Sequence, residues 1–327
     1  MCITDKEVKA FKRDGVVCLR GILTDEMVEG MRGAIDDQMR HCGLSGTGYN
    51  LEAIASQIWA QGNRVDVGAA KRLDMDNVAR RIQADSASAP LLEPGQSGEQ
   101  AAFFYDVAGW KTYKSIRETA LDSALPEAAA TLLESKLINF WEDTTFVKTP
   151  GTRQKTAFHQ DYAYFQITGE QCVVVWIPLD PASAENGVMR YIRGSHLWGR
   201  TFAPNLVISQ TPTTEATDEK LMDIESNEDA YDIISFDVEP GDVIIHHVMT
   251  IHGAGGNMSD RNRRAVSFRY CGDDVRYFDR KGAVPQASVT HALQDGEPLR
   301  ALDYPIVWPK PWPGMKLADL WPATSQR

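Results

Sequence analysis

Apolar and polar residues near the start of the chain follow a pattern that predicts two helices with a strand between them. Thr4 is followed three residues later by Glu7, which forms the capping box of a first helix, and Gly15 stands where that helix would end. The apolar run Val16 to Leu19 then predicts a short strand. Thr24 can cap a second helix, whose apolar residues recur at four-residue spacing and are expected to belong to the core. These residues are Met27, Met31, Ile35 and Met39.

The middle of the chain carries weaker signals. Residues 43 to 100 show no clear period, and the Ser-, Pro- and Gly-rich part from Ser86 to Ser97 is expected to be a loop. Residues 112 to 136 are expected to be helical, with a break near Pro126 because proline lacks the N–H that continues a helix. No internal repeat is visible, and no polar linker is long enough to divide the chain. We therefore expect one domain over residues 1–327.

Beyond Leu137, short β-rich runs replace the helical pattern, and turn residues such as Glu185-Asn186-Gly187 separate them. Many short strands at this spacing, with helices gathered upstream, predict a mainly β fold of the jelly-roll type with α additions. Within the domain we expect a helical part at residues 1–136, a β core at about 137–275 and a C-terminal tail at 276–327. The runs are Ile138–Lys148, Thr156–Ile167, Cys172–Leu179, Val188–Ile192, Asp232–Val238, Asp242–Met249 and Arg264–Tyr270.

Two further segments stand apart from the strand pattern. Gly199 to Tyr231 is long, Thr-rich and acidic, so we interpret it as a solvated lid over a functional site. Its acidic part, Glu215 to Asp232, could instead select a cationic substrate. The C-terminal part is rich in Trp and Pro, which we expect to form an ordered tail packed on the barrel. These residues are Trp308, Trp312, Trp321, Pro305, Pro309, Pro311, Pro313 and Pro322.

Composition narrows the classes of protein to which this chain can belong. Its 327 residues are within reach of one large β-barrel with helical additions. A formal net charge of −11, without a block of Lys or Arg, argues against a nucleic-acid partner. The longest apolar run, Val173 to Ile177, is far shorter than the ~20 residues that span a bilayer. The five cysteines are scattered, and charged residues stand where an export signal would be apolar. We expect a cytoplasmic protein with reduced thiols and no membrane partner.

His159-Gln160-Asp161 is the first candidate for metal-binding chemistry. It lies within a strand-like run, where side chains alternate between faces, so His159 and Asp161 are expected to point the same way. A third ligand must come from elsewhere, and His252, which follows a later β-rich run, is the best candidate. His246 would share a face with His252 on an unbroken strand and is the rival third ligand. Two histidines and one carboxylate on one face of a metal are diagnostic of non-haem Fe(II) oxygenases.

The open positions of such an iron site suit a 2-oxo acid and O2. Fe(II) with one carboxylate ligand keeps a positive charge, which favours a dianionic cosubstrate. The far carboxylate of that cosubstrate needs a partner, and an arginine can bind it through two parallel hydrogen bonds. Arg263 lies eleven residues after His252 and would return beside the metal if two antiparallel strands meet there. Arg264 faces the opposite way on a strand, so only one of the two arginines can serve.

Several linked motifs lie between Leu137 and Tyr270. They are Phe146-Val147-Lys148-Thr149-Pro150-Gly151, Thr156-Ala157-Phe158-His159-Gln160-Asp161, Val175-Trp176-Ile177-Pro178-Leu179-Asp180, Glu185-Asn186-Gly187, Arg193-Gly194-Ser195-His196, Gly241-Asp242, and His252-Gly253-Ala254-Gly255-Gly256-Asn257 with Arg263. In order and spacing, these motifs closely resemble the phytanoyl-CoA dioxygenase family. The resemblance implies a double-stranded β-helix core, a jelly-roll or cupin-like arrangement, that binds Fe(II) and 2-oxoglutarate.

The resemblance also implies roles for individual residues. By the family pattern, His159, Asp161 and His252 would be the metal ligands. Arg263 would pair with the 2-oxoglutarate carboxylate. Asp161 stands where related halogenases carry a small residue that lets chloride bind, which argues against a halogenase. The pattern places a further set of residues along the cosubstrate pocket, namely Lys148, Gln160, Trp176 and Ser267.

Together these inferences predict an Fe(II)- and 2-oxoglutarate-dependent dioxygenase that uses O2 and a small-molecule substrate. Its default reaction is hydroxylation of an unactivated C–H bond, with succinate and CO2 as co-products, and desaturation or ring formation would use the same site. The alternative from another class is a cupin-like zinc hydrolase or isomerase, because zinc also accepts two histidines and a carboxylate. Such an enzyme has no obvious need for Arg263. A binding protein without catalysis would not need the intact triad. The sequence leaves the primary substrate and the oligomeric state open.

Overall fold

The computed structural model of the chain describes most of its length. The expected loop from Ser86 to Ser97, together with Trp312 and Trp321 of the C-terminal tail, lies outside the described residues. No helix in the described part is long and apolar enough to cross a bilayer. The cytoplasmic localisation stays a prediction. The described residues are 3–40, 49–51, 101–206, 209–212, 218–281, 283, 286, 289, 291–310 and 314–320.

The first helix and the strand after it lie where the sequence predicts them. Helix α1 (Asp5–Asp14) begins with a capping box between Thr4 and Glu7. It ends at Gly15, whose φ of 76° is left-handed and therefore suits glycine. Strand β1 (Val16–Leu19) follows directly, so both predictions are confirmed.

Helix α2 (Asp25–Arg40) carries the predicted methionine-rich stripe on its buried face. Thr24 Oγ1 accepts a hydrogen bond from Met27 N at 3.3 Å, as a capping residue does. Met31 and Ile35 are fully buried, and the ends of the stripe pack partly buried against the same core. The interpretation of the stripe as core is confirmed.

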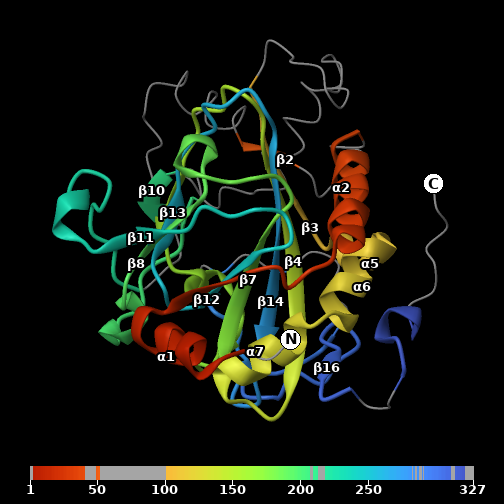
Figure 1. The fold of residues 1–327 in the computed structure, drawn as a ribbon. Coiled ribbons are helices and arrows are strands. Elements are labelled where there is room, and N and C mark those ends of the chain that lie inside the picture. The colour runs from red at the N-terminus through yellow and green to blue at the C-terminus, as the bar shows by residue number, and fades with distance from the viewer. Residues whose placement is uncertain are drawn as a thin grey trace.

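Helices α6 (Lys114–Asp122) and α7 (Leu125–Leu133) occupy the region that the sequence predicts as helical, and the short helix α5 (Gly109–Thr112) lies just before it. The break lies at residues 123–124, just before the predicted position. Pro126 itself sits in the first turn of α7, where a helix has no use for the missing N–H. In Figure 1, α2, α5 and α6 lie together beside the long central strands.

A large antiparallel sheet forms the backbone of the described structure. Its strands follow the order β1-β12-β7-β14-β4-β3-β2, with β16 also paired to β4. The part that the sequence predicts as helical thus also supplies β1, β2 and β3 to the edges of this sheet. The outer face packs against the helices in a core that includes Trp110, Phe140 and Phe268. The strands are β2 (Tyr49–Asn50), β3 (Phe103–Val107), β4 (Ile138–Lys148), β7 (Cys172–Pro178), β12 (Val243–His247), β14 (Arg263–Cys271) and β16 (Ile306–Trp308).

A smaller antiparallel sheet covers the other face of the large sheet. Its order is β11-β8-β13-β5, and Figure 1 shows β8, β11 and β13 on the side away from α2 and α6. Trp176, Tyr191 and Ile244 pack in a core between the two sheets. The expected double-stranded β-helix fold is therefore confirmed. The strands are β5 (Thr156–His159), β8 (Met189–Ile192), β11 (Ile233–Ser235) and β13 (His252–Ala254).

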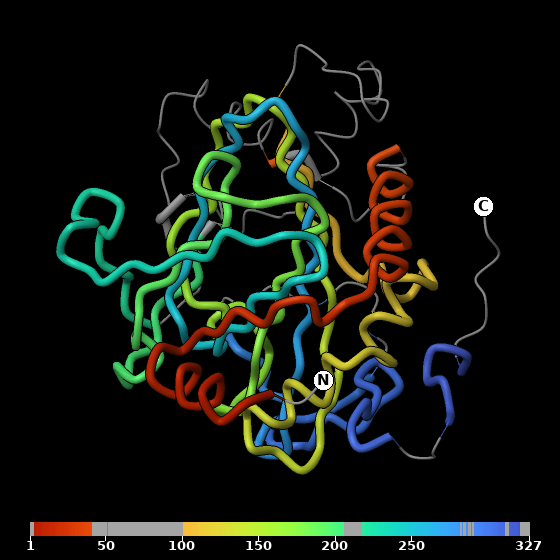
Figure 2. Tube along the Cα trace, in the orientation of Figure 1, coloured from red at the N-terminus to blue at the C-terminus, as the bar shows by residue number. Residues whose placement is uncertain are grey.

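Both ends of the described chain pack against this sandwich. Figure 2 shows the N-terminal segment running from α1 across the molecule to α2. Near the C-terminus, the 3-10 helix η5 (Leu317–Leu320) lies against α6, where Arg117 Nε donates to Ala318 O at 3.3 Å. The remaining short elements are β6 (Ile167–Thr168), β9 (Asn205–Leu206), β10 (Ser209–Pro212), β15 (Arg276–Tyr277), η2 (Ala184–Asn186), η3 (Ser195–Trp198) and η4 (Glu228–Ala230).

The predicted strand Thr156–Ile167 is wrong in its second half. Strand β5 ends at His159, and a 3-10 helix, η1 (Asp161–Tyr164), follows it. A hydrogen bond of 3.1 Å from Tyr162 N to Val248 O fixes this turn of the chain. The local pattern is β-like, but a contact with a segment more than eighty residues away decides the conformation.

The segment Gly199 to Tyr231 is only partly the solvated lid that the sequence predicts. Within its described part, Leu221 and Ile224 are buried and pack with Phe158 of strand β5. Glu225 Oε1 also accepts a hydrogen bond from Phe158 N at 3.3 Å. This portion is therefore anchored behind a strand of the small sheet, and closure of the segment as a lid stays a prediction.

Candidate metal and cosubstrate site

Two histidines face each other across neighbouring strands of the small sheet. His159, the last residue of β5, pairs directly with His252, the first residue of β13. Their ring centroids lie 4.3 Å apart. Asp161 closes the group, since its Oδ1 lies 3.6 Å from His159 Nε2 and its Oδ2 lies 3.6 Å from His252 Nε2. All three side chains are buried, and one ligand atom from each lies within 4.8 Å of the others.

The backbone fixes the orientation of both imidazole rings. His159 Nδ1 lies 2.7 Å from Ala157 O, and His252 Nδ1 lies 2.9 Å from Thr250 O. A carbonyl can only accept, so each Nδ1 carries the proton and each Nε2 keeps a lone pair directed at Asp161. Ligands that share one metal at about 2.1 Å each lie roughly 3–4 Å apart, which agrees with this spacing. Two imidazole nitrogens and one carboxylate are a donor set that fits Fe(II).

The reason for the proximity of His159 and Asp161 differs from the one that the sequence suggests. The two residues do not share one face of a strand, because Asp161 begins η1. The turn after Gln160 brings the Asp161 carboxylate back beside the end of β5 instead. The expected pairing of the two side chains is present, while the strand argument for it is wrong.

Electrostatics keeps His252 and Asp161 in the protonation states that a metal needs. Burial lowers the pKa of His252 well below its usual value, and the neighbouring His159 lowers it further. Burial alone would raise the pKa of Asp161, but the imidazoles of His252, His159 and His246 together hold it well below its usual range. A neutral imidazole and an ionised carboxylate are the metal-binding forms of these groups.

His246, the rival third ligand, contacts the carboxylate of this group. It is 1% exposed on β12, and its Nε2 lies 3.1 Å from Asp161 Oδ2. Its Nδ1 is buried without a partner. The group of possible metal ligands contains His159, Asp161 and His252 but not His246. His246 is therefore placed to hold Asp161, a role that the sequence analysis did not foresee. The period-two alternation of β12, which puts Ile244 and His246 on the inner face, was the signal available for it.

Arg263 begins β14 on the same inner face of the large sheet. It is 2% exposed, and its Nε and Nη1 atoms are buried without a hydrogen-bond partner. Its guanidinium carbon lies 5.7 Å from the centre of the Trp176 ring. Burial lowers its pKa to about 10, so the group stays charged at neutral pH. A buried charge with unpartnered donors is costly unless a ligand satisfies it, which fits an anionic cosubstrate.

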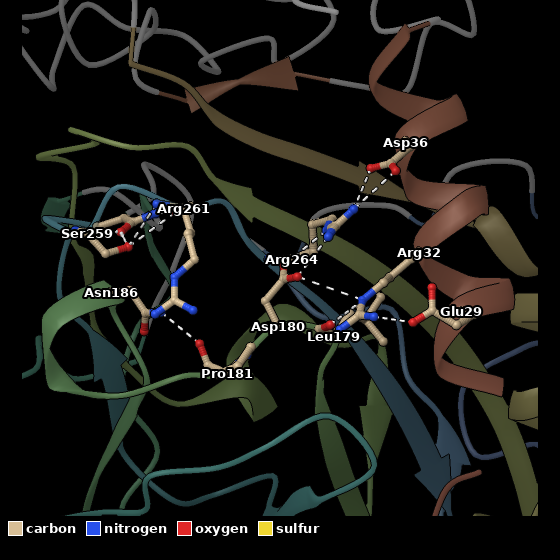
Figure 3. Close-up of polar contacts among 11 residues, drawn as sticks. Glu29, Arg32, Asp36, Leu179, Asp180, Pro181, Asn186, Ser259, Arg261 and Arg264 are labelled. Atoms are coloured by element: carbon tan, nitrogen blue, oxygen red, sulfur yellow. Dashed lines mark hydrogen bonds and ion pairs between the residues drawn. The ribbon is translucent and has the colours of Figure 1, made fainter. Parts of the chain in front are cut away.

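Arg264, the neighbour of Arg263, points the other way and is fully engaged. Its guanidinium donates to Asp180 Oδ1 at 2.8 Å and to Asp36 Oδ1 of α2 at 2.9 Å. Figure 3 shows these contacts, together with Arg32 of α2 reaching the carbonyl of Leu179. The hydrogen bond with Asp180 is the largest of the effects that raise the pKa of Arg264. Arg264 therefore ties α2 to the barrel and leaves no donor for a cosubstrate.

The other residues that the resemblance assigns to the cosubstrate pocket fall into two groups. Lys148, opposite Arg263 on β4, is fully buried and donates to Gly255 O at 2.6 Å. Trp176 and Ser267 are direct cross-strand neighbours on β7 and β14, and both are buried. These residues lie on the strands that carry or flank Arg263, and their pocket role stays a prediction.

Gln160 belongs to the second group, because its amide bonds to backbone groups. Gln160 Nε2 donates to Arg200 O at 3.1 Å and to Met249 O at 3.0 Å. Gln160 Oε1 accepts from Phe202 N at 3.0 Å. The structure thus gives Gln160 a part in fixing the segment around residue 201 beside β5. Sequence reasoning missed this role because the partners are backbone atoms with no residue preference.

Comparison with known proteins identifies the family and agrees with the fold. A family model described as phytanoyl-CoA dioxygenase (PhyH) matches residues 11–265. The peroxisomal phytanoyl-CoA dioxygenase of Homo sapiens is 28% identical over 143 residues, which are 41% of this chain and 40% of that protein. The chain thus matches about two fifths of the length of the first curated relatives. The phytanoyl-CoA dioxygenase domain-containing protein 1 of Bos taurus is 24% identical over 278 residues, 82% of this chain and 89% of that protein.

Solved structures show the same fold at low sequence identity. The non-heme alpha ketoglutarate dependent carbocyclase SnoK from nogalamycin biosynthesis superposes with a TM-score of 0.62 at 20% identity, covering 93% of this chain and 96% of that chain. EctD from S. alaskensis, solved with 2-oxoglutarate and 5-hydroxyectoine, superposes with a TM-score of 0.55 at 18% identity, covering 90% and 85%.

Proposed function

Because the chain belongs to the phytanoyl-CoA dioxygenase (PhyH) family, we propose that it is an oxygenase that uses Fe(II), 2-oxoglutarate and O2 to hydroxylate an unactivated C–H bond of a small-molecule substrate. One observation carries the proposal. The buried His159, Asp161 and His252 converge within 4.8 Å, and the buried Arg263 offers unpartnered donors from the same inner face of the barrel. The first feature suits a divalent iron, and the second suits the dianionic cosubstrate.

In this proposal, His159, Asp161 and His252 bind the metal, and Arg263 binds the far carboxylate of 2-oxoglutarate. When bound, iron supplies the redox chemistry by which O2 and 2-oxoglutarate oxidise the substrate, with succinate and CO2 as co-products. Related solved structures support this pair of cofactors, since SnoN was solved with Fe3+ and alpha ketoglutarate and EvdO2 with 2-oxoglutarate. Lys148, Trp176 and Ser267 are proposed to line the cosubstrate pocket.

The chain prepares this site before any ligand arrives. The backbone carbonyls of Ala157 and Thr250 hold the two imidazoles with Nε2 turned toward Asp161. His246 holds the Asp161 carboxylate through a contact of 3.1 Å. Burial of all these groups excludes bulk water, so a charged ligand is attracted more strongly than it would be at the surface.

Ring formation or epimerisation is a second candidate outcome at the same site. Two of the similar solved structures are described as a carbocyclase and an epimerase, and both are alpha ketoglutarate dependent. These reactions also begin with loss of a substrate hydrogen, so the metal and cosubstrate residues would be unchanged. The alternative of a zinc hydrolase or isomerase does not account for Arg263, which would then stay a buried charge without a ligand.

Turnover with a metabolite library tests the proposal. The purified protein is incubated with Fe(II), 2-oxoglutarate, O2 and pooled small molecules, and succinate and product masses are followed. Hydroxylation predicts substrate-dependent succinate with a product heavier by one oxygen atom. A product lighter by two hydrogen atoms would indicate ring formation or desaturation, and an unchanged mass would indicate epimerisation. Hydrolysis or isomerisation of a library member with zinc, without use of 2-oxoglutarate, would contradict the proposal.

A further inference from the structure

Two buried cysteines lie opposite each other on the inner face of the large sheet. Cys172 of β7 and Cys271 of β14 are direct cross-strand partners, and neither side chain is exposed to solvent. Both are free thiols, and Cys271 Sγ donates to Cys172 Sγ at 3.7 Å. The proposed function leaves this pair unused. Two adjacent thiols have a property that a single buried cysteine lacks, because together they can give up two electrons by forming a disulfide.

The backbone around the two cysteines sets them at a spacing that a disulfide can span. Gly272 N donates to Gln171 O at 2.6 Å, which marks the neighbouring residues as a hydrogen-bonded pair. Cys172 O points away from β14 and accepts from Val248 N at 3.0 Å. Cys172 and Cys271 therefore form a non-hydrogen-bonded pair, in which antiparallel strands bring the Cα atoms to about 4.5 Å. Disulfides usually join Cα atoms about 4.4–6.8 Å apart, so the bond can form without separating the strands.

The pair lies one row beyond the residues that surround the candidate metal site. Cys172 shares a face of β7 with Val174, which pairs with His246 of β12. His246 in turn contacts Asp161 at 3.1 Å. Burial raises the pKa of the Cys172 thiol most, the contact with Cys271 raises it further, and the charge of Asp161 adds to both effects. The thiol is thus close enough to the candidate metal ligand to sense its charge.

A second connection between the pair and the candidate site runs through the backbone. Val248 N donates to Cys172 O at 3.0 Å, and Tyr162 N donates to Val248 O at 3.1 Å. Tyr162 follows Asp161 directly in the chain. Val248 also packs in one apolar core with both cysteines. A short path of packed and hydrogen-bonded groups therefore joins the thiols to the candidate metal site, which suits the transfer of electrons between them.

The chemistry of the proposed function supplies an oxidant inside the barrel. Oxidation of 2-oxoglutarate to succinate and CO2 provides two of the four electrons that complete reduction of O2 requires. During hydroxylation, the C–H bond of the substrate provides the other two. When no substrate is bound, these two electrons must come from another group, or the site oxidises its own side chains. A buried dithiol is a suitable donor, because thiols are readily oxidised and a disulfide can be reduced again.

We propose that Cys172 and Cys271 are an internal two-electron donor, which is oxidised to a disulfide when the enzyme turns over without its primary substrate. The inference rests on the proposed function, because that reaction supplies the oxidant. Two S–H bonds break and one S–S bond forms. One oxygen atom of O2 enters succinate, and the other leaves as water with the two thiol protons. Overall, 2-oxoglutarate, O2 and two thiols give succinate, CO2, one disulfide and water.

Burial makes this route distinguishable from ordinary oxidation by an agent in solution. Neither thiol of the pair is exposed, whereas Cys18 on β1 is a free and partly exposed thiol. Buried, protonated thiols react slowly with oxidants from solution, because the thiolate is the reactive form. An oxidant from solution should therefore reach Cys18 before the pair. Oxidation from inside the barrel should reverse this order.

Reaction of the holoenzyme without a primary substrate tests the proposal through the state of its thiols. The reduced protein is freed of reductant, loaded with Fe(II) and 2-oxoglutarate under anaerobic conditions, and then exposed to O2. Succinate, the intact protein mass and disulfide-linked peptides are measured. We expect succinate, a protein lighter by two hydrogen atoms, and a linked peptide pair that contains Cys172 and Cys271. Loaded protein without 2-oxoglutarate, and metal-free protein treated with the thiol oxidant diamide, should not form this link in the same time.

Variants separate electron donation from structural support. Cys172→Ala combined with Cys271→Ala removes both thiols and keeps small apolar side chains on the two strands. In this double variant we expect no loss of hydrogen, and addition of oxygen to other side chains instead. Its unfolding temperature and the visible absorbance of its Fe(II)–2-oxoglutarate complex show whether it folds and binds the cosubstrate. Cys18→Ala is the matched control and should give the same masses and linked peptides as wild type.

The outcomes distinguish this inference from the function beneath it. If wild type releases succinate without linking Cys172 to Cys271, the inference is overturned and the oxygenase proposal stands. If 2-oxoglutarate is not consumed at all, the proposed function fails, and the inference fails with it. If diamide links the two cysteines in metal-free protein as fast as the complete reaction does, the pair is an ordinary accessible dithiol and the inference is overturned. Equal addition of oxygen to wild type and the double variant would also contradict it.

Discussion

The polar side chains on the two faces of strand β14 differ in whether they have hydrogen-bond partners. On the outer face, Arg264 is satisfied by Asp180 and Asp36, and Val266 and Phe268 continue the core beneath the helices. On the inner face, Arg263 and Arg269 are buried with donors that have no partner. The outer face is therefore complete without a ligand. The inner face keeps buried donors without partners, which is what a site built for an anionic ligand requires.

In the small sheet, single side chains show the same contrast between engaged and available polar atoms. The Nδ1 atoms of His159 and His252 are tied to carbonyls, while their Nε2 atoms turn to Asp161. In each ring, Nδ1 is held by the backbone and Nε2 stays available to a metal. Substitutions on the available side should change ligand binding more than stability, and substitutions on the structural side should do the reverse.

The largest effect is expected from the three candidate metal ligands. His159→Ala, Asp161→Ala or His252→Ala should abolish iron binding and turnover, because each removes one of three donors from a site without a spare position. Metal content after dialysis against Fe(II), measured together with succinate release, checks this. His196→Ala is the matched control, since its ring contacts Lys12 O of α1 and is not one of the candidate ligands. If His252→Ala kept iron while His246→Ala lost it, the third ligand would be His246.

Arg263→Ala is expected to have the next largest effect. Losing one partner of a buried charge pair costs about 3–5 kcal/mol, or some hundreds- to thousands-fold in 2-oxoglutarate affinity. Iron content should be unchanged, because no ligand is removed. Arg263→Lys should recover only part of the affinity, since lysine lacks the planar fork. Isothermal titration with 2-oxoglutarate is the measurement, and equal affinity in wild type and Arg263→Ala would remove the cosubstrate role from this residue.

His246→Phe should give an intermediate effect on the inner face. Partners that orient a metal ligand typically contribute about 10–100-fold in metal affinity or activity. The ring of phenylalanine keeps the packing but cannot reach Asp161 with a hydrogen bond. His247→Phe, the adjacent residue on the opposite face of β12, is the matched control. An unchanged Fe(II) affinity in His246→Phe would show that the 3.1 Å contact with Asp161 does not contribute to metal binding.

Arg264→Ala is expected to have the smallest effect on ligand binding and the clearest effect on stability. The change leaves Asp180 and Asp36 without their donor, which should cost about 1–3 kcal/mol of unfolding free energy. Affinity for 2-oxoglutarate should change little. Arg263→Ala should show the opposite pair of results, with stability kept or raised because an unpartnered buried charge is removed. Urea unfolding of both variants compares them directly, and equal destabilisation would contradict the division between the two faces.

Features set by local rules were predictable from the sequence. The capping box at Thr4 and the stripe around Met31 follow from helix geometry, and both are confirmed. A jelly-roll β fold was also predictable, because turn residues mark its strands, and the family resemblance implied the double-stranded β-helix. His159, Asp161 and His252 could be singled out since few residue types form an iron site, and the structure does bring them together.

Features set by distant contacts were not predictable. The turn into η1 depends on a bond between Tyr162 and Val248, so the strand expected there ends early. The packing of Leu221 against Phe158 is likewise a tertiary contact, and the polar, aperiodic sequence around Leu221 gives no signal for it. The pairing of Glu142 with Arg269 is likewise a tertiary feature, because strands β4 and β14 lie far apart in the sequence.

The most direct test of the central claim is an anaerobic titration of 2-oxoglutarate into the Fe(II)-loaded protein, followed by visible metal-to-ligand absorbance. The account predicts a saturable band in wild type, the same band at much higher 2-oxoglutarate concentration in Arg263→Ala, and no band in His252→Ala. Arg264→Ala should titrate like wild type. The absence of a band in wild type, with zinc bound tightly at the same residues, would contradict the account and favour the hydrolase or isomerase.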